Sequence, residues 1–179
     1  MIIYVTISGM GSKVLCYPDQ NKNDLEKSLD YLYELHLSKG LSELDIAKSK
    51  TVIILGAYGG RFDQEIANVQ LMYQWASRFQ RLVLADHSNI SFLLDPNFEH
   101  VIRPIRYEGI YEGMSCGLLP LAHRVDSLVT SGLEWNLQDE SLELGVRISS
   151  SNRIPEKSQE VTVKTSQSIV WTASYKYCT

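Results

Sequence analysis

The residues best suited to chemistry stand in two short loops, each directly after a predicted strand. The loop "PDQNKND" carries Asp19 and Asp24, and the turn "GAYGGRFDQ" carries Arg61 and Asp63. Ligands of open α/β sheets bind beyond the carboxyl ends of the strands, so both loops would line one crevice if their strands were parallel neighbours. Mg²⁺ takes one or two carboxylates plus substrate phosphates, and an arginine holds a phosphate through two donors. The two loops therefore indicate a site for a phosphate and a metal ion.

Each of these residues also has a purely structural explanation. Asp24 and Asp63 stand at predicted helix starts, where an acidic residue is favoured for capping alone. Arg61 and Asp63 could form a surface ion pair, which contributes little to stability. The turn matches neither the P-loop pattern nor G-x-G-x-x-G. The local pattern therefore leaves a charged helix start and a phosphate site both open.

The elements that would position these loops alternate between strand and helix. Continuous apolar runs predict strands at residues 13–17, 51–55 and 81–86. Asn23 followed by Glu26 forms a capping pattern that opens a helix ending near Ser38, and helical spacing predicts a second helix over residues 64–79. This order predicts an α/β domain with a parallel sheet. Because the sheet has so few strands, we expect it to be truncated, with an exposed edge and an uncovered apolar face.

The second half of the chain changes character after Pro96, where the helical period disappears. Short strand-like runs recur instead, separated by polar turns, which is typical of a β-sandwich or barrel. The runs are "HVIRPI", "SCGLLPLA", "DSLVTSG", "LELGVRIS", "EVTVKT" and "SIVWTASYKY". The sequence therefore predicts two domains, an α/β domain over residues 1–98 and an all-β sandwich over residues 99–179.

Composition excludes several other classes of protein. The chain of 179 residues is 44% hydrophobic and 21% charged, which is ordinary for a soluble globular protein. Its net charge of −4 gives no reason to expect a nucleic-acid partner. No apolar run is long enough to span a membrane. The three cysteines and four histidines form no close pairs, which argues against zinc and disulfides. We expect a cytoplasmic protein without a membrane partner.

Two polar or aromatic features stand out in the second half. Trp135 lies in "SGLEWNL", and a tryptophan either fills a core or stacks on a flat cationic ring. The run "ISSSN", which ends with Ser151 and Asn152, is by itself typical of a turn. These residues alone do not decide between structure and binding.

Taken together, the segments resemble the thiamine pyrophosphokinase family. The matching segments are "PDQNKNDLEKSL", "GAYGGRFDQEIANV", "GLLPL", "TSGLEWNL", "LELGVRISSSN" and "VTVKTSQSIVWT", in the family's order between residues 11 and 175. The resemblance implies an α/β catalytic domain, a β-sandwich thiamine-binding domain, and a homodimer with active sites between subunits. It also implies an enzyme, thiamine diphosphokinase, that transfers pyrophosphate from ATP to thiamine, releases AMP and uses Mg²⁺.

The resemblance assigns roles to individual residues. It implies catalytic roles for Asp24, Arg61 and Asp63, with either aspartate as the general base. It implies that Asp19, Asp24 and Asp63 hold the metal. It implies ATP or phosphate contacts by Asp19, Gln20, Arg61, Gln64 and Asn68. It implies that Trp135 stacks on thiamine from the other subunit, with Ser151 and Asn152 nearby.

Two departures from the family pattern weaken the expected metal site. Asn21 and Asn23 stand where the family more often has Asp and Thr, so one negative charge is lost. The family's upstream acidic motif G-D-x-D-S has no counterpart, and residues 1–10 look unrelated to the family. The alternative to a working enzyme is therefore a truncated, non-catalytic module that binds thiamine or supports dimerisation.

Overall fold

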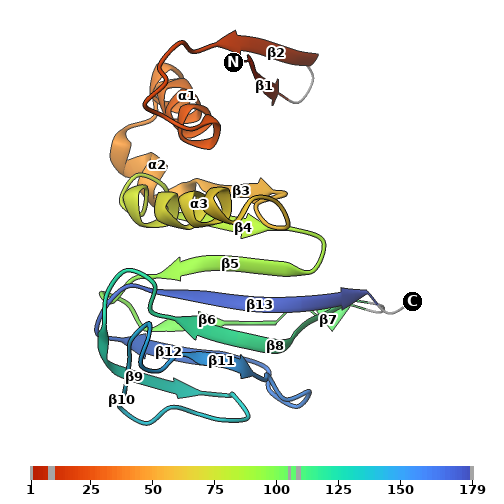
Figure 1. Cartoon of the computed structure of the whole chain (residues 1–179), viewed down its shortest axis with the longest axis vertical. Coiled ribbons are helices and arrows are strands. Elements are labelled where there is room, and N and C mark those ends of the chain that lie inside the picture. Colours follow the sequence, from red (N-terminus) through yellow and green to blue (C-terminus); the bar gives the residue numbers. More distant parts are fainter. Residues whose placement is uncertain (1, 8–10, 105, 108–109, 178–179) are drawn as a thin grey trace.

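The structure is a computed structural model that describes residues 2–7, 11–104, 106–107 and 110–177 (Figure 1). The helices are α1 (Asp24–Ser38), α2 (Glu43–Ser49) and α3 (Phe62–Gln74). The strands of the first half are β1 (Ile2–Ile7), β2 (Gly11–Cys16), β3 (Thr51–Leu55), β4 (Arg81–Ala85) and β5 (Asn89–Leu94). The strands of the second half are β6 (His100–Ile102), β7 (Arg106–Tyr107), β8 (Ile110–Leu119), β9 (Val125–Ser131), β10 (Glu140–Leu142), β11 (Ser149–Asn152), β12 (Val161–Thr165) and β13 (Ile169–Tyr177).

The first predicted strand does not join the sheet that the sequence suggested. β2 contains most of the segment 13–17, but it pairs antiparallel with β1 in a separate two-stranded sheet. Strands joined by a short connection pair readily in this antiparallel way, and β1 supplies an apolar partner close by in the chain. The condition that this strand lies parallel and next to the strand at 51–55 is therefore not met.

A single mixed sheet of seven strands forms the framework of the molecule. Its order is β11-β8-β13-β5-β4-β3, with β7 paired to β8. β3 and β4 are parallel, whereas β4–β5, β5–β13, β13–β8 and β8–β11 are antiparallel. A second sheet of four strands, β10-β9-β12-β6, completes a sandwich. The predicted fold class, an α/β N-terminal domain followed by a β-sandwich, is confirmed, although its parallel part is reduced to one strand pair.

Adjacent residues of the large sheet face two different cores. In β13, Val170 packs in a core with Leu84 and with Leu71 of α3, whereas Trp171 packs in another core with Leu128 of the second sheet. This follows because successive side chains of a strand point to opposite faces. The helices therefore cover one face near β3 and β4, and the second sheet covers the opposite face near β8 and β13 (Figure 1). The sheet also runs through the boundary predicted at residue 98, which stays a prediction.

Helix α3 is shorter than the sequence predicted, and α2 was not predicted. The chain leaves the helix after Gln74, which lets Trp75 and Phe79 stack in the core with their ring centroids 5.7 Å apart. α2 begins with a capping box between Ser42 and Asp45, and this pattern in "LSELD" was the overlooked signal.

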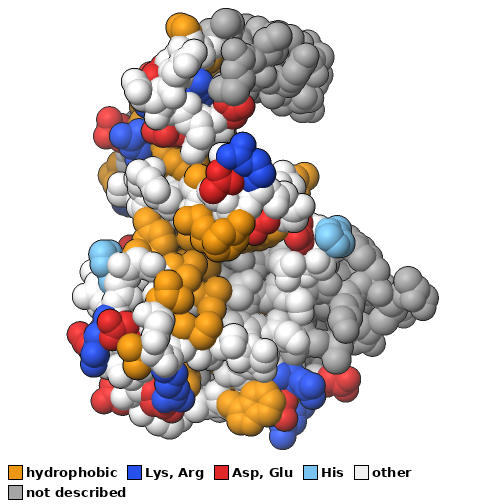
Figure 2. All heavy atoms as spheres, viewed as in Figure 1, with side chains coloured by type: hydrophobic (Ala, Val, Ile, Leu, Met, Phe, Trp, Pro, Cys, Tyr) orange, Lys and Arg blue, Asp and Glu red, His pale blue; other side chains and the backbone are white. Residues whose placement is uncertain are grey.

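The β3 edge of the large sheet exposes apolar side chains. Ile53 is 62% and Leu55 80% exposed, whereas Val52 and Ile54 face the helical core. No described strand pairs with the outer side of β3. The predicted exposed edge and uncovered apolar face are therefore confirmed within the described residues. On the face seen in Figure 2, hydrophobic side chains also form a band across the middle of the molecule. None of the described helices is both long and apolar enough to cross a bilayer.

Candidate functional site

A cavity of about 850 Å³ lies between the loop before α1 and the first half of α3. Figure 2 shows the molecule hollowed between α1 and α3, the two helices that flank this cavity. Six of its polar lining residues are Gln20, Asn23, Asp24, Lys27, Gln64 and Asn68. The cavity therefore brings together the two loop segments that the sequence singled out, even though β2 and β3 are not neighbours. It does so because each loop leads into a helix whose first turns face the other.

The loop before α1 is shaped by its own asparagine and aspartate side chains. The Asn23 side-chain oxygen accepts a hydrogen bond of 2.8 Å from the backbone N–H of Glu26 and caps α1. Asp19 Oδ1 accepts a bond of 2.8 Å from the N–H of Asn21, which closes a tight turn. Asp24 lines the cavity, whereas Asp19 is exposed and turned to its own loop. Asn23 thus keeps the capping function of the more usual Thr.

The glycine turn before α3 is held from the helix. Glu65 Oε1 accepts hydrogen bonds from the backbone N–H groups of Gly59 (2.8 Å) and Gly60 (3.1 Å). Asn68 Nδ2 donates a bond of 3.0 Å to the carbonyl of Ala57. Gly59 has a φ of +88°, a backbone conformation that other residues adopt only with strain. Glu65 and Asn68 therefore fix the turn that carries Arg61.

Arg61 and Asp63 bind each other rather than the cavity. Two guanidinium nitrogens of Arg61 donate to the Asp63 carboxylate, at 3.1 Å and 2.5 Å. This hydrogen bonding lowers the pKa of Asp63 and raises the pKa of Arg61. Their side chains are 75% and 61% exposed, and neither residue lines the cavity. Arg61 can reach a phosphate only by exchanging its carboxylate partner, and Asp63 is a weakened proton acceptor while the pair persists.

Trp135 is presented to solvent by a loop that Asn152 supports. Trp135 is 57% exposed, whereas Asn152 is 5% exposed. Asn152 Nδ2 donates to the carbonyl of Trp135 at 2.8 Å, and its Oδ1 accepts from the N–H of Trp135 at 3.3 Å. Asn152 is therefore a support of the Trp135 backbone, and its polar atoms are already occupied. Ser151 lines a separate cavity of about 240 Å³ together with Cys116.

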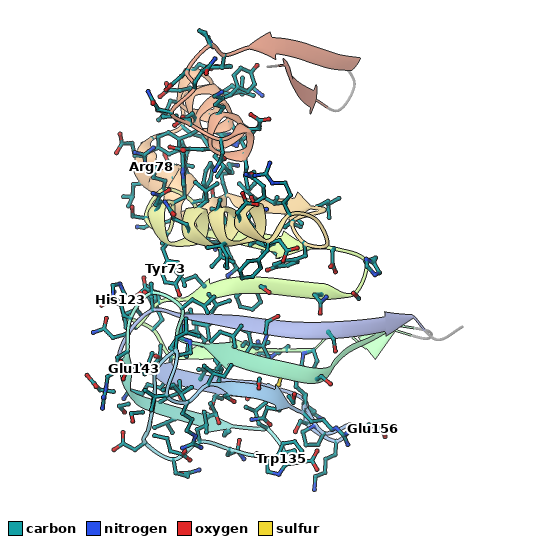
Figure 3. The ribbon with its side chains drawn as sticks, viewed as in Figure 1. Tyr73, Arg78, His123, Trp135, Glu143 and Glu156 are labelled. Carbon is teal, nitrogen blue, oxygen red and sulfur yellow. The ribbon has the colours of Figure 1, made fainter. Side chains whose placement is uncertain are left out.

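The two candidate regions lie far apart within one chain. α1 lies toward one end of the long axis, and Trp135 lies near the other (Figures 1 and 3). Trp135 is absent from the lining of the cavity beside α1. A single copy of the chain therefore does not bring Trp135 to Asp24.

Comparison with known sequence families assigns both halves of the chain. The model described as "Thiamin pyrophosphokinase, catalytic domain" matches residues 3–84, and the model described as "Thiamin pyrophosphokinase, vitamin B1 binding domain" matches residues 99–170. The chain belongs to the thiamine pyrophosphokinase family. The match begins at residue 3, earlier than the sequence motifs indicated.

Individual members of the thiamine pyrophosphokinase family are longer than this chain. Thiamine pyrophosphokinase 3 of Oryza sativa subsp. japonica is 32% identical over 171 residues, which cover 95% of this chain and 60% of the relative. Thiamine pyrophosphokinase 1 of Arabidopsis thaliana is 32% identical over 168 residues, covering 93% of this chain and 58% of the relative. The solved thiamin pyrophosphokinase of Candida albicans has the same fold, with a TM-score of 0.72 at 24% identity, over 92% of this chain and 65% of that one. The chain thus spans about three fifths of the length of these curated relatives.

The three aspartates predicted to hold a metal do not form a cluster. Among the described residues, no group of three or more His, Cys, Asp or Glu side chains is placed to hold a metal ion. Asp24 is the one of the three that lines the cavity, Asp63 is paired with Arg61, and Asp19 is turned to its own loop. The arrangement still fits Mg²⁺ bound together with a substrate, because that ion needs only one or two carboxylates when phosphates supply other ligands.

Sequence reasoning missed two residues at this site and left the role of Cys116 open. Lys27 lines the cavity from the first turn of α1, and Glu65 holds the glycine turn. A glutamate soon after a glycine pair was a usable signal for Glu65, whereas nothing in the local sequence marked Lys27. Cys116 is buried, and burial raises the pKa of its thiol to about 12, so it stays protonated and is not a nucleophile.

Proposed function

We propose that the chain transfers the pyrophosphoryl group of ATP to the hydroxyl group of thiamine, giving thiamine pyrophosphate and AMP. The observation that carries this proposal is the cavity between α1 and α3, which gathers Gln20, Asp24, Gln64 and Asn68 from the two family motifs. Its volume of about 850 Å³ lies in the range usual for small-molecule sites. Family membership of both halves supports the same reaction.

Catalysis would consist mostly of positioning and charge neutralisation, as in other phosphoryl transfers. Asp24 would hold Mg²⁺ together with the ATP phosphates, and the ion would neutralise charge on the polyphosphate. Arg61 would move from Asp63 to a phosphate oxygen, which its planar fork can bind through two donors. Either Asp24 or Asp63 would take the proton of the thiamine hydroxyl, since Asp63 is no longer weakened as a proton acceptor once Arg61 has left it.

We also propose that the working site is formed by two chains. Trp135 would stack on the flat cationic ring of thiamine bound at the cavity of a second copy. The support is the separation of Trp135 from the cavity within one chain. The exposed apolar residues on the same half of the chain, Val146 (79%) and Leu144 (58%), would be covered by such contact.

The direct test is incubation with ATP, Mg²⁺ and thiamine, followed by chromatography for AMP and thiamine pyrophosphate. Stoichiometric formation of both products is expected, and a folded sample without turnover would refute the activity.

A complementation assay tests the two-chain site. Asp24→Ala and Trp135→Ala should each be inactive alone, since each removes one half of every site. Mixing the two variants should restore activity, because a mixed pair contains one site with both residues intact. A Trp135→Ala sample mixed with Asp24→Ala that stays inactive, despite proven subunit exchange, would contradict shared sites.

A second candidate function is a non-catalytic thiamine-binding module. It is favoured by two observations taken together, the uncovered β3 edge in one half and the intact Trp135 loop in the other. This function predicts calorimetric binding of thiamine without ATP turnover, and binding that Trp135→Ala abolishes. Equal binding by that variant would exclude it.

We propose the cytoplasm as the location of the protein. A fluorescent fusion that accumulates in another compartment would contradict this assignment.

A further inference from the structure

The cavity beside α1 contains two lysines in different electrostatic situations. Lys22 Nζ forms an ion pair of 2.6 Å with Asp30 Oδ2, so its charge is already balanced. Lys27 is only 3% exposed, yet no described residue provides it with a side-chain hydrogen bond or an ion pair. Both lysines line the cavity. Among the described residues, none balances the charge of the nearly buried Lys27.

The position of Lys27 makes this arrangement more unfavourable still. It lies in the first turn of α1, where its N–H bonds to the carbonyl of the cap residue Asn23 at 3.1 Å. A helix N-terminus carries a partial positive charge, which favours an anion and disfavours a cation. Burying an ammonium group without a partner also costs free energy. Asp24, one turn earlier, lines the same cavity but is exposed and forms no ion pair with Lys27. An anion in the cavity would relieve both penalties.

We propose that Lys27 is a binding residue for the polyphosphate of the nucleotide, and this inference rests on the proposed function. The start of α1, Lys27, Gln64 and Asn68 line one cavity, and a helix start beside a cation suits an extended anion. The ammonium is a compact point charge with three donors and binds phosphate oxygens well. Arg61 is bound by Asp63 and lies outside the cavity lining, and Lys22 is paired with Asp30. Among the described residues of the lining, Lys27 is therefore the cation without an ion-pair partner. Thiamine, itself a cation, would be repelled from this position.

The test is calorimetric titration of the full chain with two probes, ATP and inorganic tripolyphosphate. Lys27→Met removes the charge but keeps an unbranched side chain, and it should weaken binding of both probes at least tenfold. Lys27→Arg keeps the charge and should retain most of the affinity. Lys39→Met, an exposed lysine at the end of the same helix, is the matched control and should bind like the wild type. Lys22→Met should lose less affinity than Lys27→Met, since Asp30 already balances its charge.

Thermal unfolding separates binding from a structural role. The melting temperature of Lys27→Met should equal or exceed that of the wild type, because an unpaired buried charge is removed. A lower melting temperature, or unchanged affinity for both probes, would overturn the proposal. So would a larger loss of affinity in Lys22→Met than in Lys27→Met.

The two probes also distinguish this inference from the proposed function. If the wild type binds tripolyphosphate through Lys27 but does not bind ATP, the pyrophosphokinase assignment fails and the anion site stands. If it binds ATP independently of Lys27, the assignment stands and this inference fails. If it binds neither probe, the anion site is refuted.

Discussion

The middle and the β3 edge of the seven-stranded sheet are covered differently. At Val170 and Trp171 of β13 both faces are buried, by helix-side residues on one face and by the second sheet on the other, and Trp171 is 1% exposed. At β3 only the helical face is covered, and Leu55 on the opposite face is 80% exposed. The polar residues that form the α1–α3 cavity cluster beyond the less covered end. The candidate nucleotide site thus lies in the half where one face of the sheet edge is uncovered, away from the sheet strands that are buried on both faces.

The largest loss of stability is expected at Trp171, where both faces of the sheet are covered. Trp171→Ala should lower the free energy of unfolding by ~3–5 kcal/mol, because it leaves a large cavity between the two sheets. Trp135→Ala removes the same side chain from an exposed loop and should cost less than about 0.5 kcal/mol. Denaturant titration of both variants measures the difference. Similar losses for the two tryptophans would contradict the contrast between core and exposed loop.

A smaller loss of stability is expected at Asn152, a buried residue whose side chain supports the backbone of the exposed Trp135. Asn152→Ala should cost about 2 kcal/mol, since the backbone N–H and carbonyl of Trp135 lose their partner. Asn97→Ala removes an exposed amide and should change stability by less than about 0.5 kcal/mol. Denaturant titration gives both values, and tryptophan fluorescence should report a more mobile Trp135 only in the first variant. An unchanged stability of Asn152→Ala would show that the loop holds its conformation without this support.

A still smaller loss of stability is expected when the glycine turn before α3 loses the support of Glu65. Glu65→Ala should cost about 1 kcal/mol, because two backbone N–H groups lose a charged acceptor at a partly exposed site. Hydrogen exchange of the Gly59 and Gly60 amides should accelerate in this variant. Glu65→Gln keeps an acceptor oxygen and should preserve most of their protection. Equal exchange rates in wild type and Glu65→Ala would show that Glu65 does not hold the turn.

The smallest change in stability is expected at the exposed edge itself. Ile53→Lys should alter the free energy of unfolding by less than about 0.5 kcal/mol, yet reduce self-association seen by analytical ultracentrifugation. Ile54→Lys, one residue further on, faces the helical core and should unfold the domain. If both variants behaved alike, the assignment of the two sheet faces would be wrong.

The sequence predicted well those features that depend on local pattern. The sequence predicted the capping residue Asn23 and the strand-to-helix turn after β3. These two features place Asp24 and Gln64 at one cavity. The fold class followed from the change of period after Pro96. Strand pairing was harder, because β2 could join β3 or pair with β1, and both choices satisfy the same apolar pattern.

The sequence could not reveal how the polar side chains share partners. The sequence left open whether Arg61 and Asp63 act on a phosphate or pair with each other, and the structure shows the pair. Asn152 was expected beside thiamine, whereas its amide supports the backbone of Trp135, seventeen residues earlier. Lys27 belongs to an unremarkable helical segment, and only the folded chain shows that it is buried with no ion-pair partner among the residues that the structure describes. The features of Asn152 and Lys27 depend on contacts between segments, which composition and spacing do not specify.

The continuity of the large sheet has a consequence for how the protein can be divided. The two matched family regions end at residue 84 and begin at residue 99, and β5 lies between them. β5 hydrogen-bonds to β4 on one side and to β13 on the other. A cut in the Asp95–Asn97 turn would therefore leave each fragment with an open strand edge that matches the other. The sequence divides into two family regions, but a continuous sheet joins them in the fold. We therefore expect the two fragments to be obtained in folded form only when they are produced together.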